Sequence, residues 1–342
     1  MLRDRLRNQK LRPSTTVDAV DVVRWFGAMQ AQDYPGAKWA IGRRARHLSD
    51  ADVEAAFNSG AIVRTHVLRP TWHFVAAEDL HWMLALTGSR LNAINRRYGV
   101  RLGLDERLFD RVRGIVERAL DGQSLTRPEI ATELRRRRIA ATGQRLAHLL
   151  FDLEVQRVIC SGPRCGNQFT YRLAPPAPSG GLPERDEGLS ALATRYFRSH
   201  GPATVKDFAW WSGLTMSEAK IGARAAGNAV LSGAPGPDSV ARATYLLPNY
   251  DEYLIAYRDR GAVLDPDRAR NYGVFTSQEH PHQVVVDGRV AGSWRRTIGA
   301  TSLRVNVRSY ARLSPGQQLD IVREGKRYGR FLAVPAEVHF DG

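Results

Sequence analysis

The hydrophobic and polar positions of this chain repeat one order of elements three times: a helix, a short helix-turn-helix and an apolar hairpin. In the middle copy, residues 106–119 are apolar at helical spacing. Thr126 then stands where an N-cap is expected, and Glu129 occupies the matching capping-box position. A second helix is therefore expected to begin at Arg127. This order is typical of a winged helix, in which the hairpin forms the wing.

The other elements of the three copies follow from the same periodicities. The middle copy continues with a helix at 143–154 and two β-rich runs at 155–160 and 168–173. The third copy has helices at 189–199, 203–211 and 215–226, then strands at 229–232 and 244–247. The first copy has helices at 17–29 and 49–58, a less distinct helix within 36–46, and strands at 62–67 and 71–75.

The pattern changes after residue 278 to short alternating runs, with Asp287-Gly288 as a strong hairpin signal. Strands are expected at 284–287, 289–294, 301–307, 318–323 and 328–333. The predicted fold class is α+β, with three tandem winged-helix units followed by a small antiparallel β-barrel-like C-terminal module. The expected domains are 1–100, 101–178, 185–250 and 251–342, with a Pro/Gly-rich linker at 174–181.

The charge of the chain indicates a polyanionic partner. The 342 residues include 50 lysines and arginines against 35 acidic residues, a net charge of +15. Only five of the cationic residues are lysines, and arginine suits phosphate recognition, although a GC-rich genome would produce the same skew. No run approaches the roughly 18 apolar residues of a membrane span. We expect a cytoplasmic, nucleoid-associated protein that binds nucleic acid and no membrane.

Motifs for metals, nucleotides and acyl-enzyme chemistry are missing from the sequence. It contains no H-x-x-x-H pair, no phosphate-binding P-loop and no G-x-S-x-G elbow. Cys160 and Cys165 form a single C-x4-C without a second ligand pair, so two free thiols are expected. The sequence therefore predicts neither a metal site nor a cofactor.

The first of three polar clusters is Gln30-Ala31-Gln32-Asp33, which follows a helix and precedes a Pro-Gly break. If this segment is extended, the amides of Gln30 and Gln32 lie on one face. Glutamine does not titrate, so the two amides would act only by hydrogen bonding, holding a water or polarising a polar group. The alternative is a solvated helix end.

The second cluster begins an apolar strand, and alternation places Arg69, Thr71 and His73 on one face. The alternative is an exposed strand face with Trp72 in the core.

The third cluster crowds acidic, aromatic and basic side chains into one helical turn. Its candidates for DNA binding or support of the site are Asp251, Tyr253, Arg258 and Arg260. The alternative is an ion-paired surface helix that joins the third winged helix to the C-terminal module.

Taken in order, these motifs resemble the winged-helix DNA glycosylases of the AlkZ and YcaQ type. The resemblance rests on Gln-x-Gln, the Arg-x-Thr-x-His strand, Leu-Pro-x-x-Asp-Glu-Tyr-Leu at 247–254, and the hairpin 286–296 with Trp294 and Arg295. It implies three winged helices and a β-barrel around a DNA-binding channel, with Gln30 and Gln32 catalytic. With glutamine at the second position of Gln-x-Gln, Gln32, the chain resembles the AlkZ type. That resemblance implies bulky or cross-linking N7-alkylpurines, or simple adducts, as substrates.

The expected function is a monomeric, monofunctional DNA glycosylase that hydrolyses the N-glycosidic bond of N7-alkylated purines in duplex DNA. Such a base is already cationic, so it leaves without protonation. The enzyme then needs a placed water and oxygens beside an oxocarbenium-like sugar. Two alternatives stay open: a non-enzymatic winged-helix regulator, and a family member that binds damaged DNA without turnover.

Overall fold

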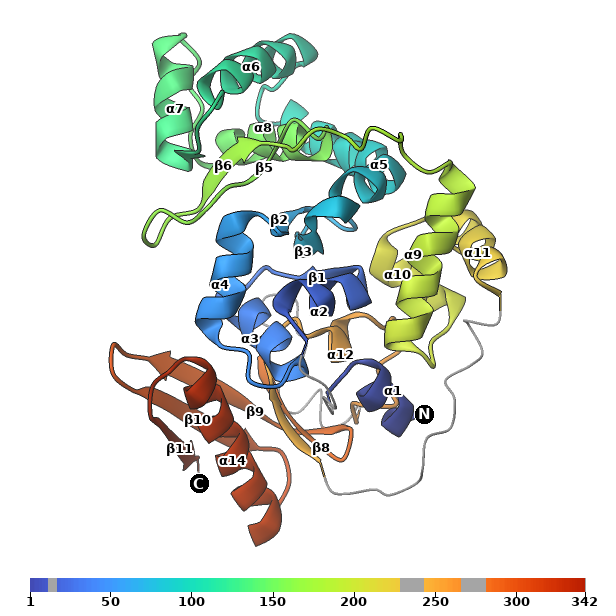
Figure 1. Ribbon diagram of the computed structural model, residues 1–342, viewed down its shortest axis with the longest axis vertical. Coiled ribbons are helices and arrows are strands. Elements are labelled where there is room, and N and C mark those ends of the chain that lie inside the picture. The colour runs from blue at the N-terminus through green and yellow to red at the C-terminus, as the bar shows by residue number, and fades with distance from the viewer. Residues whose placement is uncertain (12–16, 228–242, 266–280, 342) are drawn as a thin grey trace.

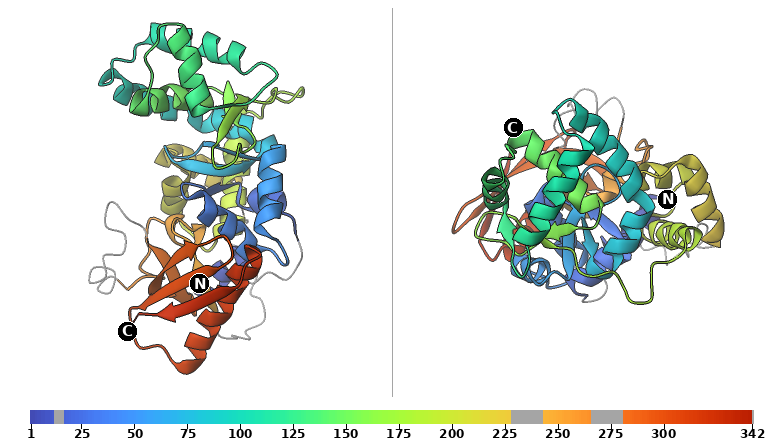
Figure 2. Two further views of the ribbon diagram at one scale, coloured as in Figure 1. Left: turned by 90° about the vertical axis from the view of Figure 1, so that its left-hand side faces the viewer. Right: turned by 90° about the horizontal axis from the view of Figure 1, so that it is seen from above.

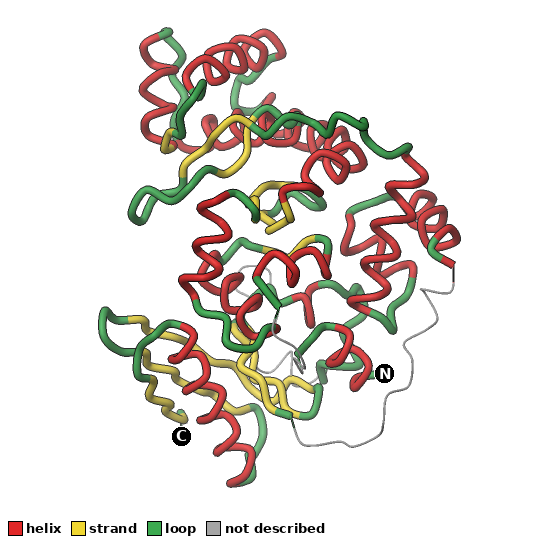
Figure 3. Tube along the Cα trace, in the orientation of Figure 1, coloured by secondary structure: helices red, strands yellow, loops and turns green. Residues whose placement is uncertain are grey.

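The computed structural model describes residues 1–11, 17–227, 243–265 and 281–341. The chain forms an elongated body (Figures 1 and 2), with helices α6 (Glu106–Ala119) and α7 (Arg127–Arg136) at one end and α14 (Pro315–Phe331) at the other. The N-terminal unit lies between these two ends and contacts both the second unit and the C-terminal module. The predicted α+β class is confirmed, and Figure 3 shows helices and short sheets alternating along the body.

The N-terminal unit is a three-stranded sheet with three helices. Its elements are α2 (Ala19–Phe26), β1 (Ala28–Gln30), α3 (Tyr34–Arg44), α4 (Asp50–Ser59), β2 (Ile62–His66) and β3 (Trp72–Ala76), preceded by α1 (Leu2–Asn8). The sheet is antiparallel with the order β1-β3-β2. Helix α2 ends at Phe26, earlier than the expected Met29, because Gly27 adopts φ +80 and turns the chain into β1. Helix α3 fulfils the expectation of a helix within 36–46.

The second unit repeats this order of elements. The 3₁₀ turn Ala77–Asp79 and the long helix α5 (Leu80–Val100) lead to α6, β4 (Leu125–Thr126), α7, α8 (Gly143–Val155), β5 (Ile159–Ser161) and β6 (Thr170–Leu173). The sheet order β4-β6-β5 again places the third strand between the other two. The capping box of Thr126 and Glu129 is confirmed, and so is the start of α7 at Arg127.

The third unit differs from the expected pattern in its strands. Helices α9 (Arg185–His200), α10 (Val205–Ser212) and α11 (Met216–Ala225) are as expected. The predicted strand 229–232 lies outside the described residues. The other predicted wing strand, β7 (Thr244–Leu247), instead pairs with β8 (His282–Val286) of the C-terminal sheet. Its four residues are all buried, and a solvated wing would not bury them.

The C-terminal module is a mixed five-stranded sheet covered by one helix. Its order is β11-β10-β9-β8-β7, with β9 (Arg289–Ile298), β10 (Leu303–Ser309) and β11 (Ala336–Phe340). Strands β10 and β11 are parallel and the other neighbours are antiparallel. The expected antiparallel β-barrel-like module is therefore confirmed only in part: the sheet is a half-barrel with β7 and β11 at its edges, and its β10–β11 pair is parallel. The predicted turn at Asp287-Gly288 is confirmed between β8 and β9.

The strands predicted at 318–323 and 328–333 are also wrong, because helix α14 occupies both segments. Ser314 caps this helix by accepting a hydrogen bond from the Gln317 backbone N–H at 3.2 Å, and Pro315 begins it. The buried residues Ile321 and Tyr328 are seven positions apart, which is two helical turns. The centre of the Tyr328 ring lies 4.7 Å from that of Trp39 in α3 and 5.7 Å from that of Trp294 in β9. The N-terminal unit and the C-terminal sheet therefore share one core.

Candidate active site

The Gln-Ala-Gln segment lies at the end of an edge strand. Strand β1 pairs with β3, and Gln30 is directly opposite His73 in this antiparallel pair. Directly opposite residues place their side chains on the same face with Cβ atoms about 5 Å apart. Gln30 is buried, and its Oε1 accepts no hydrogen bond from the described residues. Gln32 follows the strand and is exposed, and its Oε1 lies 3.5 Å from the Trp72 backbone N.

Two buried side chains fix the backbone of this segment. The Gln30 N–H donates to Glu252 Oε1 at 2.8 Å. The Ala31 carbonyl accepts from Arg64 Nε at 3.0 Å, and the Arg64 guanidinium lies 4.2 Å from the centre of the Trp72 ring. Burial lowers the pKa of Arg64 to about 10, so this side chain stays cationic. Both contacts hold the backbone of the catalytic candidates in place.

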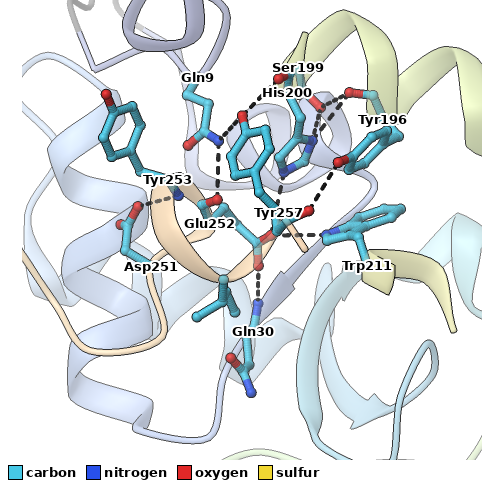
Figure 4. A network of polar contacts seen from close by, with 12 residues as sticks. Gln9, Gln30, Tyr196, Ser199, His200, Trp211, Asp251, Glu252, Tyr253 and Tyr257 are labelled. Carbon is cyan, nitrogen blue, oxygen red and sulfur yellow. Dashed lines mark hydrogen bonds and ion pairs between the residues drawn. The ribbon is translucent and has the colours of Figure 1, made fainter. Parts of the chain in front are cut away.

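Glu252 belongs to a buried polar network that joins three parts of the chain (Figure 4). Its Oε2 accepts from Trp211 Nε1 at 2.9 Å and lies 3.4 Å from His200 Nε2. Burial, which dominates, lowers the pKa of His200 despite the neighbouring carboxylate. Gln9 Nε2 donates to the Glu252 backbone carbonyl at 3.2 Å. The network therefore anchors α12 (Glu252–Ile255) to β1, α9 and α10.

The strand candidates Arg69, Thr71 and His73 carry polar atoms without partners. Buried nitrogens of Arg69 and His73 and the Thr71 hydroxyl make no hydrogen bond to the described residues. Burial, and then the charge of Arg69, lowers the pKa of His73 well below its usual range, so its imidazole is neutral at pH 7. Since buried polar groups are normally paired, such a group of unpaired atoms beside Gln30 is suited to a polar ligand. The alternative of an exposed strand face is wrong for His73, which is buried.

Asp33 connects the motif to the C-terminal sheet. Its carboxylate caps α3 by accepting from the Gly36 N–H at 3.3 Å, and it also receives Arg296 Nη2 at 2.7 and 2.8 Å. Arg296 lies on β9 next to Arg295, which is exposed. This ion pair places the β9 hairpin beside the Gln-Ala-Gln segment.

Several other candidates have structural partners. Asp251 forms a fully buried ion pair with Arg44, Tyr253 donates to the Gly288 carbonyl at 2.8 Å, and Trp294 Nε1 donates to the Leu247 carbonyl at 2.8 Å. The alternative of an ion-paired surface helix is thus wrong, because α12 is buried throughout.

Two arginines follow α12 nearer the surface. Arg258 is exposed, and the Arg260 Nε donates to the Leu254 carbonyl at 3.0 Å. Burial and then the charge of Arg69 lower the pKa of Arg260.

Sequence reasoning missed the contacts of Glu252, Arg64, Trp211 and His200. Glu252 lies in the third polar cluster, between the candidates Asp251 and Tyr253, and was not itself a candidate. Its contact with Gln30 spans 222 positions, and no local pattern specifies such a pairing. The available signal was a second carboxylate, next to Asp251, at the start of an apolar turn.

The described residues contain no cluster of three or more histidine, cysteine or carboxylate side chains that could hold a metal ion. Cys160 is buried and Cys165 is exposed, and both are free thiols. Among the helices described, none is long and apolar enough to cross a membrane.

Comparison with known proteins identifies the family. A family model described as DNA glycosylase AlkZ-like matches residues 23–331. The solved structure of the DNA glycosylase AlkZ from Streptomyces sahachiroi is similar, with a TM-score of 0.78 and 25% identity over 98% of both chains. No curated protein matches the chain. The match over most of the sequence, together with the shared fold, shows that this chain belongs to the AlkZ-like family and is a DNA glycosylase.

Proposed function

We propose that this glycosylase hydrolyses the N-glycosidic bond of N7-alkylated purines in duplex DNA, with Gln30 and Gln32 as its catalytic residues. The observation that carries the proposal is the Gln30 Oε1, a buried acceptor without a donor among the described residues, beside a neutral His73. An oxygen in this state is available to a water or to a developing positive charge. Family membership favours this enzyme over a non-enzymatic regulator.

The chemistry fits a site that holds amides rather than a free acid. An N7-alkylated purine departs as a neutral base and takes the electrons of the C1′–N9 bond. The sugar becomes oxocarbenium-like, water adds its oxygen to C1′, and the surplus proton passes to solvent. Preorganised dipoles stabilise such a transition state without proton transfer to the leaving group. The lowered pKa of His73 agrees with this scheme, because a neutral imidazole orients a water without supplying a proton.

The architecture proposed for DNA binding is a set of tandem winged-helix units in a monomer. Support comes from the shared helix-strand-helix-helix-strand-strand order of the first two units and from their equivalent sheet orders. A net charge of +15 supplies the attraction to the phosphate backbone. We assign Arg69, Thr71 and Arg260 to contacts with the DNA near Gln30, which the unpartnered polar atoms of Arg69 and Thr71 support. Arg258 and Arg295 are exposed and are assigned to phosphate contacts.

The test is base release from duplexes that carry N7-methylguanine, a bulky N7 adduct or an N7 interstrand cross-link. Gln30→Ala and Gln32→Ala are each expected to slow release by about 100-fold, as loss of one oxyanion-hole donor does. Affinity for an uncleavable lesion duplex should stay at the wild-type value. The matched control is Gln318→Ala on the exposed face of α14. Wild-type excision by both variants would remove the catalytic assignment.

A further inference from the structure

The Gln30 backbone has an N–H that its own sheet does not use. Strand β1 is an edge strand whose one neighbour among the described strands is β3. The Ala31 N–H donates to the Trp72 carbonyl at 2.7 Å, toward the β3 side. Successive N–H groups of an extended chain point in opposite directions, so the Gln30 N–H points away from the sheet. A buried N–H in this position requires a partner from another part of the chain.

Glu252 supplies that partner from the first residue of α12. Glu252 is 1% exposed, and its Oε1 accepts the Gln30 N–H at 2.8 Å. The helix that carries it is itself fixed, because Asp251 caps α12 and pairs with Arg44 of α3. The distance between β1 and α12 is therefore set by buried, charge-assisted contacts rather than by apolar packing alone.

The second carboxylate oxygen fixes the rotation of the group. Glu252 Oε2 accepts the Trp211 indole N–H at 2.9 Å and faces His200 Nε2 at 3.4 Å. Both carboxylate oxygens are thus engaged. A rotation of the carboxylate that breaks its hydrogen bond to the Gln30 N–H would also break its contacts with Trp211 and His200. Figure 4 shows Glu252 between Gln30 on one side and the Trp211 and His200 rings on the other.

We propose that Glu252 is a positioning residue for the glycosylase reaction, which sets the place of the Gln30 carboxamide by holding its backbone N–H. This inference rests on the proposed role of Gln30. Glu252 does not touch DNA in this scheme. A shift of about 1 Å in a reacting group costs as much as 100-fold in rate, so the effect should appear in the chemical step.

Glu252→Gln is the informative variant because it keeps the shape of the side chain. A glutamine has one acceptor oxygen and one NH2 group, while Gln30 and Trp211 both present N–H donors. One of the two donors must therefore face the NH2 group. Adding Trp211→Phe removes the indole donor, so in Glu252→Gln/Trp211→Phe the amide oxygen turns to Gln30 and the NH2 group faces His200.

The measurements are the single-turnover excision rate, the Kd for an uncleavable lesion duplex, and the thermal midpoint. We expect Glu252→Gln to excise about 10- to 100-fold more slowly with an unchanged Kd, and the double variant to regain part of that loss. Asp152→Asn is the matched control, since it alters a buried carboxylate that pairs with Arg96 in the second unit. It should lower the thermal midpoint and leave the excision rate of folded protein unchanged.

Wild-type excision by folded Glu252→Gln would overturn the inference, and so would a double variant no faster than the single one. If Gln30→Ala excises as fast as wild type, the proposed catalytic role of Gln30 fails instead. A slow Gln30→Ala beside a fast Glu252→Gln removes the positioning role alone.

Discussion

Arg44 on α3 donates two hydrogen bonds to the Asp251 carboxylate, at 2.7 and 2.8 Å, and both side chains are fully buried. The pair joins the N-terminal unit to α12 across 207 positions of sequence. Breaking such a pair from one side leaves an uncompensated buried charge, which is far more costly than losing a surface ion pair. Asp251 therefore acts through stability rather than through contact with DNA.

Asp251→Ala should reduce the free energy of unfolding by about 3–5 kcal/mol, because Arg44 would stay buried without its counter-charge. Chemical denaturation measures the change. The control is Asp259→Ala, which alters an exposed carboxylate eight positions later and should shift stability by no more than about 0.5 kcal/mol. An unchanged denaturation midpoint for Asp251→Ala would contradict the structural role.

Acid should weaken the fold partly through His282. Its Nδ1 accepts the Asn249 backbone N–H at 2.7 Å, which requires that nitrogen to be unprotonated. Burial first, and then Arg296, lowers the pKa of His282 to about 4, although Asp33 opposes the shift. Its contribution to stability is thus complete above the usual value near 6.5 and is lost as pH falls from there toward 4.

The comparison that isolates this group is His282→Gln, whose side-chain oxygen can accept the same N–H without titrating. Denaturation at pH 7 and pH 5 should show a smaller acid loss for this variant than for wild type. A variant at the exposed His339 should keep the wild-type difference. Equal acid losses in all three proteins would remove His282 as a cause.

Affinity for DNA should depend strongly on salt. With a net charge of +15 and cations that are mostly arginines, binding is expected to be driven by phosphate neutralisation. The logarithm of the binding constant should fall linearly with log salt, with a slope of roughly −0.9 per phosphate contacted. Fluorescence anisotropy over a salt series gives this slope. A slope near zero, or a footprint confined to one palindromic sequence, would contradict the proposed mode of binding.

Base release should leave an intact abasic strand. A lysine that forms a Schiff base must reach the sugar C1′, whereas Lys38 Nζ is held by Asp50 and Glu54, each at 2.7 Å, with the side chain 9% exposed. Borohydride added during turnover should therefore trap no covalent protein–DNA adduct, as judged by denaturing electrophoresis. An adduct that disappears in Lys38→Ala would show an amine mechanism and would reduce the glutamines to positioning residues.

Local signals in the sequence predicted the local structure well. The Thr126 capping box and the Asp287-Gly288 turn were found because neighbouring residues determine them. The segments at 318–323 and 328–333 were wrongly predicted as strands, because their apolar residues fit an alternating pattern as well as a helical one. A helix forms there because Ser314 caps its first turn, and β11, which follows the helix, supplies the strand that pairs with β10.

The sequence predicted the motif residues of the candidate site but not the buried side chains that hold them in place. Gln30, Gln32 and the Arg-x-Thr-x-His motif at 69–73 were recognisable by residue type and order. The pairing of Gln30 with His73 depends on strand register, and the bond to Glu252 depends on how three units pack. Arg44 and Arg64 could not be assigned from sequence, because buried arginines are uncommon and their burial follows from partners elsewhere in the chain.

The hydrogen bond between Gln30 and Glu252 has a consequence for biosynthesis. The two residues are separated by 222 positions, so a ribosome has made most of the chain before this contact is possible. At roughly 5–20 residues per second, the delay is about 10 to 40 seconds. Until residue 252 has been synthesised, the Gln-Ala-Gln segment of the nascent chain therefore lacks its hydrogen bond to Glu252. A transcript truncated before residue 252 yields a protein with both glutamines and without the contact that holds the first of them.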